Sequence, residues 1–184
     1  MTAILNFIFK EIRIRKAVKH IKDNSMVLDI GSGLDAKMLL MLEPRIKKGI
    51  GLDYRASKFK SRKIAVKKFI VKDRLPYRQN SFDHITMLAM IEHLKHPEKI
   101  AKECHRILRK GGSLIITCPT PRADRLLHVL LKIPLVFSDE EEATKHEKCF
   151  TADELGSLLA NAGFKKVKIK PFELGLNTLA VCYK

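Results

Sequence analysis

Short apolar segments alternate with amphipathic ones along most of the chain. Five apolar runs, each closed by glycine, proline or polar residues, predict strands at 26–30, 48–53, 68–71, 82–88 and 113–118. Three stretches between them predict helices at 36–42, 57–67 and 97–108. Because parallel strands need a crossover to connect them, this order predicts an α/β fold, a mostly parallel sheet with helices on both faces. Ligands of such sheets bind at the carboxyl ends of the strands.

The two ends of the chain depart from this alternation. Residues 1–24 place apolar side chains near helical spacing with lysines and arginines between them, which predicts an amphipathic basic helix. Such a helix either packs across the edge of a domain or lies on an anionic membrane surface. Residues 122–150 carry closely spaced leucines and are placed to form a lid over a substrate. Residues 151–184 predict a capped helix followed by an antiparallel strand pair at 167–171 and 177–183.

The charge and the cysteine pattern restrict the function further. The net charge of +16 exceeds what solubility requires and implies attraction to an anionic membrane surface or a nucleic acid. Thirteen lysines and arginines lie between positions 45 and 78, against two acids, Asp53 and Asp73. The four cysteines are far apart and form no CxxC pair, so we expect neither a metal site nor a disulfide framework. No run approaches the roughly 18 apolar residues of a membrane span, and we expect a cytoplasmic location, with peripheral membrane contact open.

A glycine turn follows the first predicted strand. The backbone at Gly31 and Gly33 can approach a ligand closely, with amide groups of the following helix directed at it. Asp53, 20 residues past Gly33 at the end of the second strand, can accept two hydrogen bonds from a ribose diol. The glycine turn and Asp53 could bind a dinucleotide just as well as another nucleoside cofactor. Ala36 stands where a dinucleotide-binding pattern places its third glycine, which makes a nicotinamide enzyme the weaker interpretation.

The middle of the chain carries several motifs in a fixed order. They are Leu75-Pro76-Tyr77, Ser81-Phe82-Asp83, Ile91-Glu92-His93-Leu94 and Arg106-Ile107-Leu108-Arg109-Lys110-Gly111-Gly112. In this order they resemble the motifs of class I S-adenosylmethionine-dependent methyltransferases. They are most similar to the type 11 group, which includes ubiquinone and menaquinone biosynthesis methyltransferases. The resemblance covers about residues 26–164.

The resemblance implies a Rossmann-like seven-stranded sheet whose last strand is antiparallel, in a single domain over 1–184 with 25–121 as the cofactor-binding half. The cofactor would be S-adenosyl-L-methionine and the product S-adenosyl-L-homocysteine. By resemblance, Gly31 and Gly33 contact the methionine moiety and Asp29 orients its ammonium group. Asp53 would hold the ribose hydroxyls.

Four further positions follow from the same resemblance. Tyr54 would lie against the adenine, and Leu88 and Ala89 would line the reacting end of the cofactor. In relatives an acid four residues before the Leu-Pro pair binds the adenine amino group, but this chain has Val71 there. Asp73, two residues before the pair, is the candidate replacement.

Three side chains are candidates for a general base, namely Glu92, His93 and His146. Each lies at a predicted loop or strand end near the cofactor, and methyl transfer to an acceptor is helped by removal of a proton. Their alternative roles are structural, since Glu92 and His93 can cap a helix and His146 can be a loop histidine.

The acceptor is open between several classes. The apolar lid and the basic first helix favour a small or amphiphilic molecule, such as a lipid, a quinone precursor or an envelope-glycan intermediate. The positive charge between positions 45 and 78 favours an RNA or DNA methyltransferase, although the chain has no Trp and three Tyr for base stacking. A non-catalytic binding module with the same fold is the third account, kept open by Val71. The sequence does not determine the oligomeric state.

Overall fold

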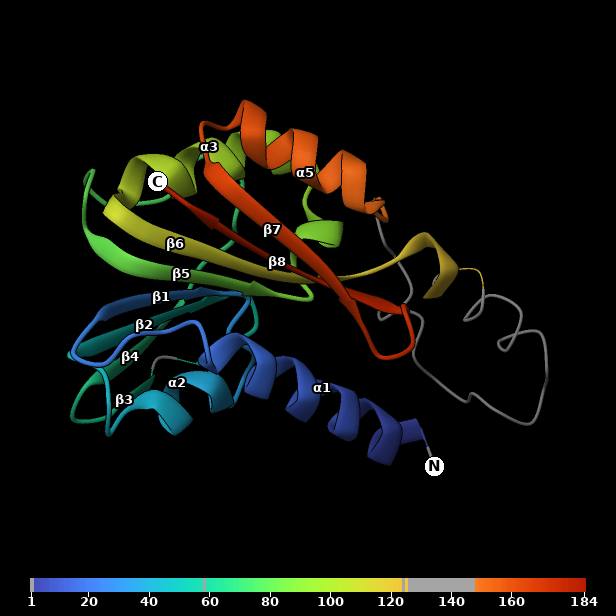
Figure 1. Ribbon diagram of the computed structural model, residues 1–184. Helices are drawn as coiled ribbons and strands as arrows, with labels where there is room; N and C mark the ends of the chain where they lie inside the picture. Colours follow the sequence, from blue (N-terminus) through green and yellow to red (C-terminus); the bar gives the residue numbers. More distant parts are fainter. Residues whose placement is uncertain (1, 58, 124, 126–147) are drawn as a thin grey trace.

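The computed structural model describes residues 2–57, 59–123, 125 and 148–184, and these build one eight-stranded sheet covered by helices (Figure 1). The helices are α1 (Thr2–Val18), α2 (Lys37–Leu42), the 3-10 turn η1 (Ile91–His93), α3 (Pro97–Ile107) and α5 (Ala152–Asn161). The strands are β1 (Met26–Ile30), β2 (Lys48–Asp53), β3 (Phe59–Lys60), β4 (Ile64–Lys68), β5 (Phe82–Leu88), β6 (Leu108–Pro119), β7 (Lys165–Phe172) and β8 (Asn177–Tyr183).

The sheet has the order β3-β4-β2-β1-β5-β6-β8-β7. Strands β4, β2, β1, β5 and β6 are parallel neighbours, and β8 runs antiparallel to both β6 and β7. Helices α1 and α2 cover one face of the sheet, and α3 and α5 cover the other (Figure 1). Each pair of helices packs on a separate apolar cluster. The predicted fold class is therefore confirmed. The short β3 at the edge is an addition to the seven strands expected.

The predicted helix over 57–67 is wrong. This segment forms β3 and β4 instead, and the third parallel strand occupies Ile64–Lys68 rather than 68–71. Ile64 and Val66 are both buried, and residues two apart point to the same face of a strand but diverge on a helix. Burial of this β-branched pair against the α2 side of the core therefore selects the strand.

Helix α1 packs along half of its length. Ile14, Ala17 and Val18 are buried in the cluster shared with α2, which agrees with the packing interpretation of the first helix. Phe7 and Ile8, in the other half, are 56% and 44% exposed, and Figure 1 shows this half reaching away from the sheet. The helices of the described ranges are too short or too polar to cross a membrane.

The C-terminal part follows the sequence closely. Thr151 caps α5 through a capping box, in which its hydroxyl accepts from the Glu154 amide at 3.2 Å and the Glu154 carboxylate accepts from the Thr151 amide at 2.9 Å. The antiparallel pair β7 and β8 is also as expected. The lid expected over 122–150 falls mostly on residues 126–147, which lie outside the described residues, as does the candidate base His146.

Candidate functional site

The glycine turn and the carboxylate of Asp53 meet at the carboxyl ends of β1 and β2. These two strands are parallel neighbours with Ile30 opposite Leu52. The Gly31 amide donates to the Leu52 carbonyl at 2.8 Å, and the Gly33 amide donates to Asp53 Oδ2 at 3.0 Å. The two features that the sequence assigned to one nucleoside are thus in direct contact.

Two glycines make this close approach sterically accessible. Gly31 has a φ of +79°, and a Cβ there would lie 3.1 Å from the Met90 side chain. Gly51 lies under the turn, and a Cβ on it would lie 2.7 Å from Ser32 Oγ. A side chain at Gly51 would push the turn away from β2, so glycine at this position fixes how closely the turn lies against Asp53.

The Asp53 side chain is 7% exposed, and both of its oxygens accept backbone amides. Besides Gly33, the Arg55 amide donates to Oδ1 at 2.8 Å, which fixes the carboxylate plane. Each carboxylate oxygen retains a further lone pair, so a diol can still be bound. Tyr54 is 50% exposed beside it, with the Arg55 guanidinium 5.3 Å from the ring centroid.

Asp29 is a buried acid beneath the turn. Its side chain is 3% exposed, and the Thr86 hydroxyl donates to Oδ1 at 2.7 Å. Burial raises the pKa of Asp29 to about 7, and the nearby charge of Asp53 adds to the rise. A cationic group bound at this end of β1 would stabilise the charged carboxylate, which is the chemistry expected of an ammonium partner.

Asp73, the candidate for the adenine contact, is already engaged by a lysine. Its carboxylate forms an ion pair with Lys99 of α3 at 2.8 Å, and that hydrogen bond lowers the pKa of Asp73. Val71 packs against the apolar cluster on the α3 side of the sheet. A contact between Asp73 and adenine would therefore compete with the Lys99 pair.

The end of β5 turns across the carboxyl edge of the sheet toward the glycine turn. Leu88 is half-buried against the α1 side of the core. Ala89 has a φ of +51°, and its amide donates to the Thr117 carbonyl at 2.8 Å. This left-handed residue redirects the chain, so that Met90 lies against Gly31. Sequence patterns did not indicate Met90, because its contact depends on that single backbone conformation.

Glu92 is a candidate base with a deeply buried side chain. It is 1% exposed, and Oε2 has no hydrogen-bond partner among the residues that the structure describes. Burial raises the pKa of Glu92 to about 7, while the charge of Arg13 acts in the opposite direction. His93 is exposed on the same 3-10 turn. Arg13 comes from α1, and burial lowers its pKa whereas Glu92 and Glu173 raise it.

Arg13 was missed in the sequence because basic residues of an amphipathic helix are usually solvated. Its helix is held over the carboxyl edge by two ion pairs to the segment after the glycine turn. Lys10 Nζ lies 2.8 Å from Asp35 Oδ2, and Lys37 pairs with Glu11. The Lys37 ammonium also lies 4.4 Å from the Phe7 ring centroid. These contacts bring α1 to the site.

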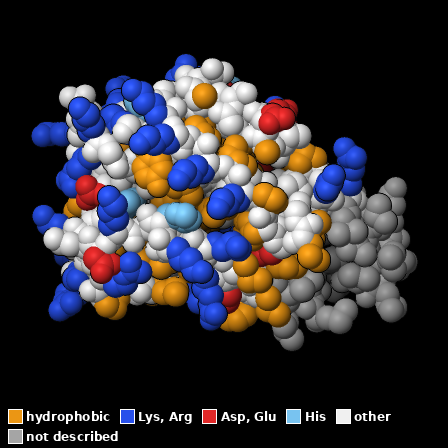
Figure 2. Space-filling view, in the orientation of Figure 1, with side chains coloured by type: hydrophobic (Ala, Val, Ile, Leu, Met, Phe, Trp, Pro, Cys, Tyr) orange, Lys and Arg blue, Asp and Glu red, His pale blue; other side chains and the backbone are white. Residues whose placement is uncertain are grey.

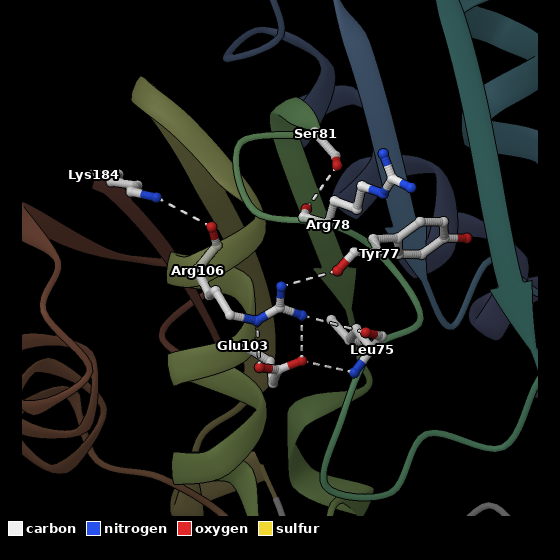
Figure 3. A network of polar contacts seen from close by, with 7 residues as sticks. All are labelled: Leu75, Tyr77, Arg78, Ser81, Glu103, Arg106 and Lys184. Atoms are coloured by element: carbon white, nitrogen blue, oxygen red, sulfur yellow. Dashed lines mark hydrogen bonds and ion pairs between the residues drawn. The ribbon is translucent and has the colours of Figure 1, made fainter.

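Two of the spaced motifs, Leu75-Pro76-Tyr77 and the one that begins at Arg106, are joined by a polar network (Figure 3). Arg106 of α3 donates to the Tyr77 carbonyl at 2.9 Å and, through Nε and Nη2, to both oxygens of Glu103 at 2.7 Å. Glu103 Oε2 accepts from the Leu75 amide at 2.9 Å. The Leu-Pro-Tyr loop is therefore fixed to the end of α3, where the Arg106-Ile107-Leu108-Arg109 motif begins.

Comparison with known proteins identifies the family. Residues 7–169 match the family model described as a methyltransferase domain. The chain belongs to this methyltransferase family. Its fold and its relatives confirm a class I S-adenosylmethionine-dependent methyltransferase of the type 11 group, whose members use S-adenosylmethionine as methyl donor.

Two relatives and one solved structure illustrate the range of this methyltransferase family. An uncharacterized protein of Methanocaldococcus jannaschii is 26% identical over 89% of this chain and 75% of its own. The demethylmenaquinone methyltransferase of Geobacillus kaustophilus is 28% identical over 60% of this chain, which spans about half of that relative, 53%. A S-adenosylmethionine-dependent methyltransferase from Thermotoga maritima, described as a possible histamine N-methyltransferase, has a TM-score of 0.68 at 23% identity, over 98% of this chain and 95% of that one. At this identity the last likeness shows the fold alone.

Proposed function

We propose that this methyltransferase binds S-adenosyl-L-methionine between the Gly31 to Gly33 turn and Asp53. The hydrogen bond of 3.0 Å from the Gly33 amide to Asp53 Oδ2 is the observation that supports the proposal, because a bare backbone turn and a carboxylate that can bind a diol are then close enough for one nucleoside to contact both. Asp29 would hold the ammonium group. Tyr54 would cover the adenine.

The remaining positions complete the cofactor site of this proposal. Leu88 and Ala89 would line the reacting end, and Asp73 would reach the adenine amino group only by leaving Lys99. When bound, the cofactor supplies an electrophilic methyl group on a positively charged sulfur and leaves as S-adenosyl-L-homocysteine. The chain then has to position the acceptor in line with it and exclude water.

The proton-transfer group in this proposal is Glu92. A carboxylate whose pKa burial raises to about 7 can accept a proton from an acceptor hydroxyl or activated carbon near neutral pH. Arg13 would stabilise the charged form of Glu92, since its guanidinium acts on that carboxylate. His93 is exposed on the same turn and His146 lies outside the described residues, so both stay candidates on their sequence position alone.

A small apolar or amphiphilic acceptor fits the surroundings of the site best. Helix α1 presents the exposed side chains Phe7 and Ile8 from the half that the Lys10–Asp35 pair fixes beside the turn. The curated relatives include demethylmenaquinone methyltransferases, whose named substrate is a quinone. We therefore propose a quinone precursor, a lipid or an envelope-glycan intermediate. Acceptors of this kind reside at membranes, and peripheral contact with an anionic membrane belongs to the proposal.

A nucleic acid is the second candidate acceptor, and one observation favours it. A hollow of about 440 Å³ at the β3–β4 edge is lined by Phe59, 42% exposed, together with Lys60, Lys67 and Lys68. An exposed ring among lysines can stack a base and hold its phosphates. Binding of oligonucleotides that falls steeply with salt and is lost in Phe59→Ala would favour this acceptor.

The cofactor site is tested by calorimetry with S-adenosyl-L-homocysteine. Asp53→Asn keeps the shape but replaces one acceptor oxygen by an NH2 donor, which faces a backbone amide of Gly33 or Arg55 and takes away an acceptor for the ribose, and we expect affinity to fall about tenfold or more. Asp153→Asn, the same charge change on the exposed first turn of α5, should leave affinity unchanged. Equal affinity of wild type and Asp53→Asn would refute the site, and absence of binding by the wild type would indicate a non-catalytic module.

The acceptor class is tested by transfer of a labelled methyl group to three extracts, of lipids and quinones, of soluble metabolites and of nucleic acids. Label in the lipid and quinone extract is the expected result. The Glu92→Gln variant should bind S-adenosyl-L-homocysteine normally but transfer the label at least about a hundredfold more slowly.

A further inference from the structure

A continuous cationic surface runs along β7 and the C-terminal half of α1, here named the β7 surface. It consists of Lys16 on α1, Lys19 in the turn directly after α1, and Lys168 and Lys170 on β7. His20, in the turn after α1, joins them, because its pKa is lowered by burial and then by the charges of Lys170, Lys168 and Lys19. Figure 2 shows Lys and Arg side chains gathered over this part of the molecule.

The pleat of β7 aligns its lysines on one face. Val167 and Ile169 turn toward the core on the α5 side, where Ile169 Cδ1 would touch a Cβ at Gly156 at 3.4 Å. Alternate residues of a strand point to opposite faces, so Lys168 and Lys170 project to the α1 side with an expected separation of about 7 Å. There they meet the lysines of α1.

Most of the charge of the β7 surface is not balanced by acids, although the charge of Lys16 acts on Glu173, directly after β7. Within the described residues, none of the four lysines forms an ion pair, and β7 contains no acidic residue. Lys16 lies 5.4 Å from the Phe172 ring centroid instead. Lysines on an edge strand hinder pairing with another chain, but this role does not account for Lys16 on α1 or for Lys19 directly after it.

Apolar side chains extend from the same region at the carboxyl edge of the sheet. Leu174, in the turn between β7 and β8, is fully exposed. Phe172 pairs with Asn177, which pairs with Pro119 at the end of β6, so this turn lies at the edge that also carries the glycine turn. Phe7 and Ile8 of α1 are exposed at that edge as well. Exposed apolar tips flanked by lysines are typical of surfaces that enter the membrane interface.

We propose that the β7 surface docks on anionic lipid headgroups, with Leu174 entering the interface and the carboxyl edge of the sheet facing the bilayer. A nucleic acid fits this surface less well, because its aromatic ring Phe172 is 7% exposed and covered by Lys16, so no base can stack on it. The inference rests on the proposed function in one respect, that an acceptor dissolved in lipid reaches the site from that edge.

The test is co-sedimentation of the full chain with phosphatidylcholine vesicles, with and without phosphatidylglycerol. We expect binding only to the anionic vesicles and a loss of binding as salt increases. Lys168→Gln/Lys170→Gln should lower the partition coefficient about 30-fold. The matched control Lys47→Gln/Lys48→Gln removes the same charge from the exposed start of β2, at the amino ends of the parallel strands, and should change it less than about twofold. Leu174→Ser should weaken binding without changing its salt dependence.

Three results would overturn the proposal: no binding to anionic vesicles at low salt, equal losses in the two double variants, or an oligonucleotide whose binding depends on Lys168 and Lys170 while vesicle binding does not. Calorimetry with S-adenosyl-L-homocysteine is run on the same variants and should be unchanged. A chain that binds vesicles but not this nucleoside would refute the proposed function and leave the docking surface standing.

Discussion

Replacing Glu92 by glutamine tests both the burial of this side chain and its chemistry. Glu92 is 1% exposed, and burial raises its pKa from 4.5 to about 7. The folded protein therefore holds this proton more tightly than the unfolded chain does. As pH rises from about 4.5 to about 7, the unfolded chain loses the proton first, and the contribution of Glu92 to stability falls until it levels off above pH 7.

The size of this effect follows from the two pKa values. The interval between 4.5 and about 7 corresponds to about 3 kcal/mol of folding free energy. Glutamine has nearly the same shape and does not titrate. Relative to wild type, Glu92→Gln should thus gain about 3 kcal/mol of stability between pH 4.5 and pH 8, with most of the gain complete at about pH 7.

Urea unfolding of both proteins at a series of pH values measures the difference directly. Titration of other groups, including Asp29, affects both proteins and cancels in the subtraction. Asp153→Asn, which removes an exposed carboxylate from α5, serves as the control and should show a nearly flat difference. A flat difference for Glu92→Gln, or one that falls with rising pH, would contradict the assignment of a buried carboxyl whose charge is disfavoured.

Two further substitutions address the polar network and the turn. Arg106→Ala removes the hydrogen bonds to Tyr77 and Glu103 and should lower the free energy of unfolding by about 1.5 to 3 kcal/mol in urea titrations. The control Lys102→Ala, on the same helix, should change it very little. If Arg106→Ala loses no more stability than this control, solvent replaces the network. Gly51→Ala places a Cβ 2.7 Å from Ser32 Oγ, which should lower stability by about 1 to 3 kcal/mol and also weaken the binding of S-adenosyl-L-homocysteine. The double variant Gly51→Ala/Ser32→Gly should recover part of both losses. If the double variant is no better than the single one, the clash with Ser32 is not the cause.

The local sequence pattern was sufficient to predict the part of the fold around the Gly31 to Gly33 turn and Asp53. A run such as Val27 to Ile30 has one stable place in an α/β protein, a strand buried on both faces, and neighbouring parallel strands bring their carboxyl ends to one edge. The meeting of the Gly31 to Gly33 turn with Asp53 then follows from the order of strands. The same holds for α5, whose start was visible as Thr151 and Glu154 at capping-box spacing.

The sequence did not predict the structure of segments with a weak local preference for helix or strand, or contacts that depend on the tertiary fold. Between 57 and 67 the helical and extended patterns compete, and burial of Ile64 and Val66 against the core decided for a strand. Arg13 and Met90 reach the site only because α1 crosses the carboxyl edge and Ala89 adopts a positive φ. Neither property leaves a signal in the residues themselves.

The order of apolar and polar positions by itself determined the alternation of strands and helices, and with it the edge at which a ligand binds, because periodicity and turn residues act over a few neighbouring positions. The tertiary structure alone decided which charges share a region: it buried Glu92 near Arg13, committed Asp73 to Lys99 and gathered the lysines of α1 and β7 on one surface. Electrostatic energies depend on distance and burial between segments far apart in the chain, and those quantities exist only once the chain has folded.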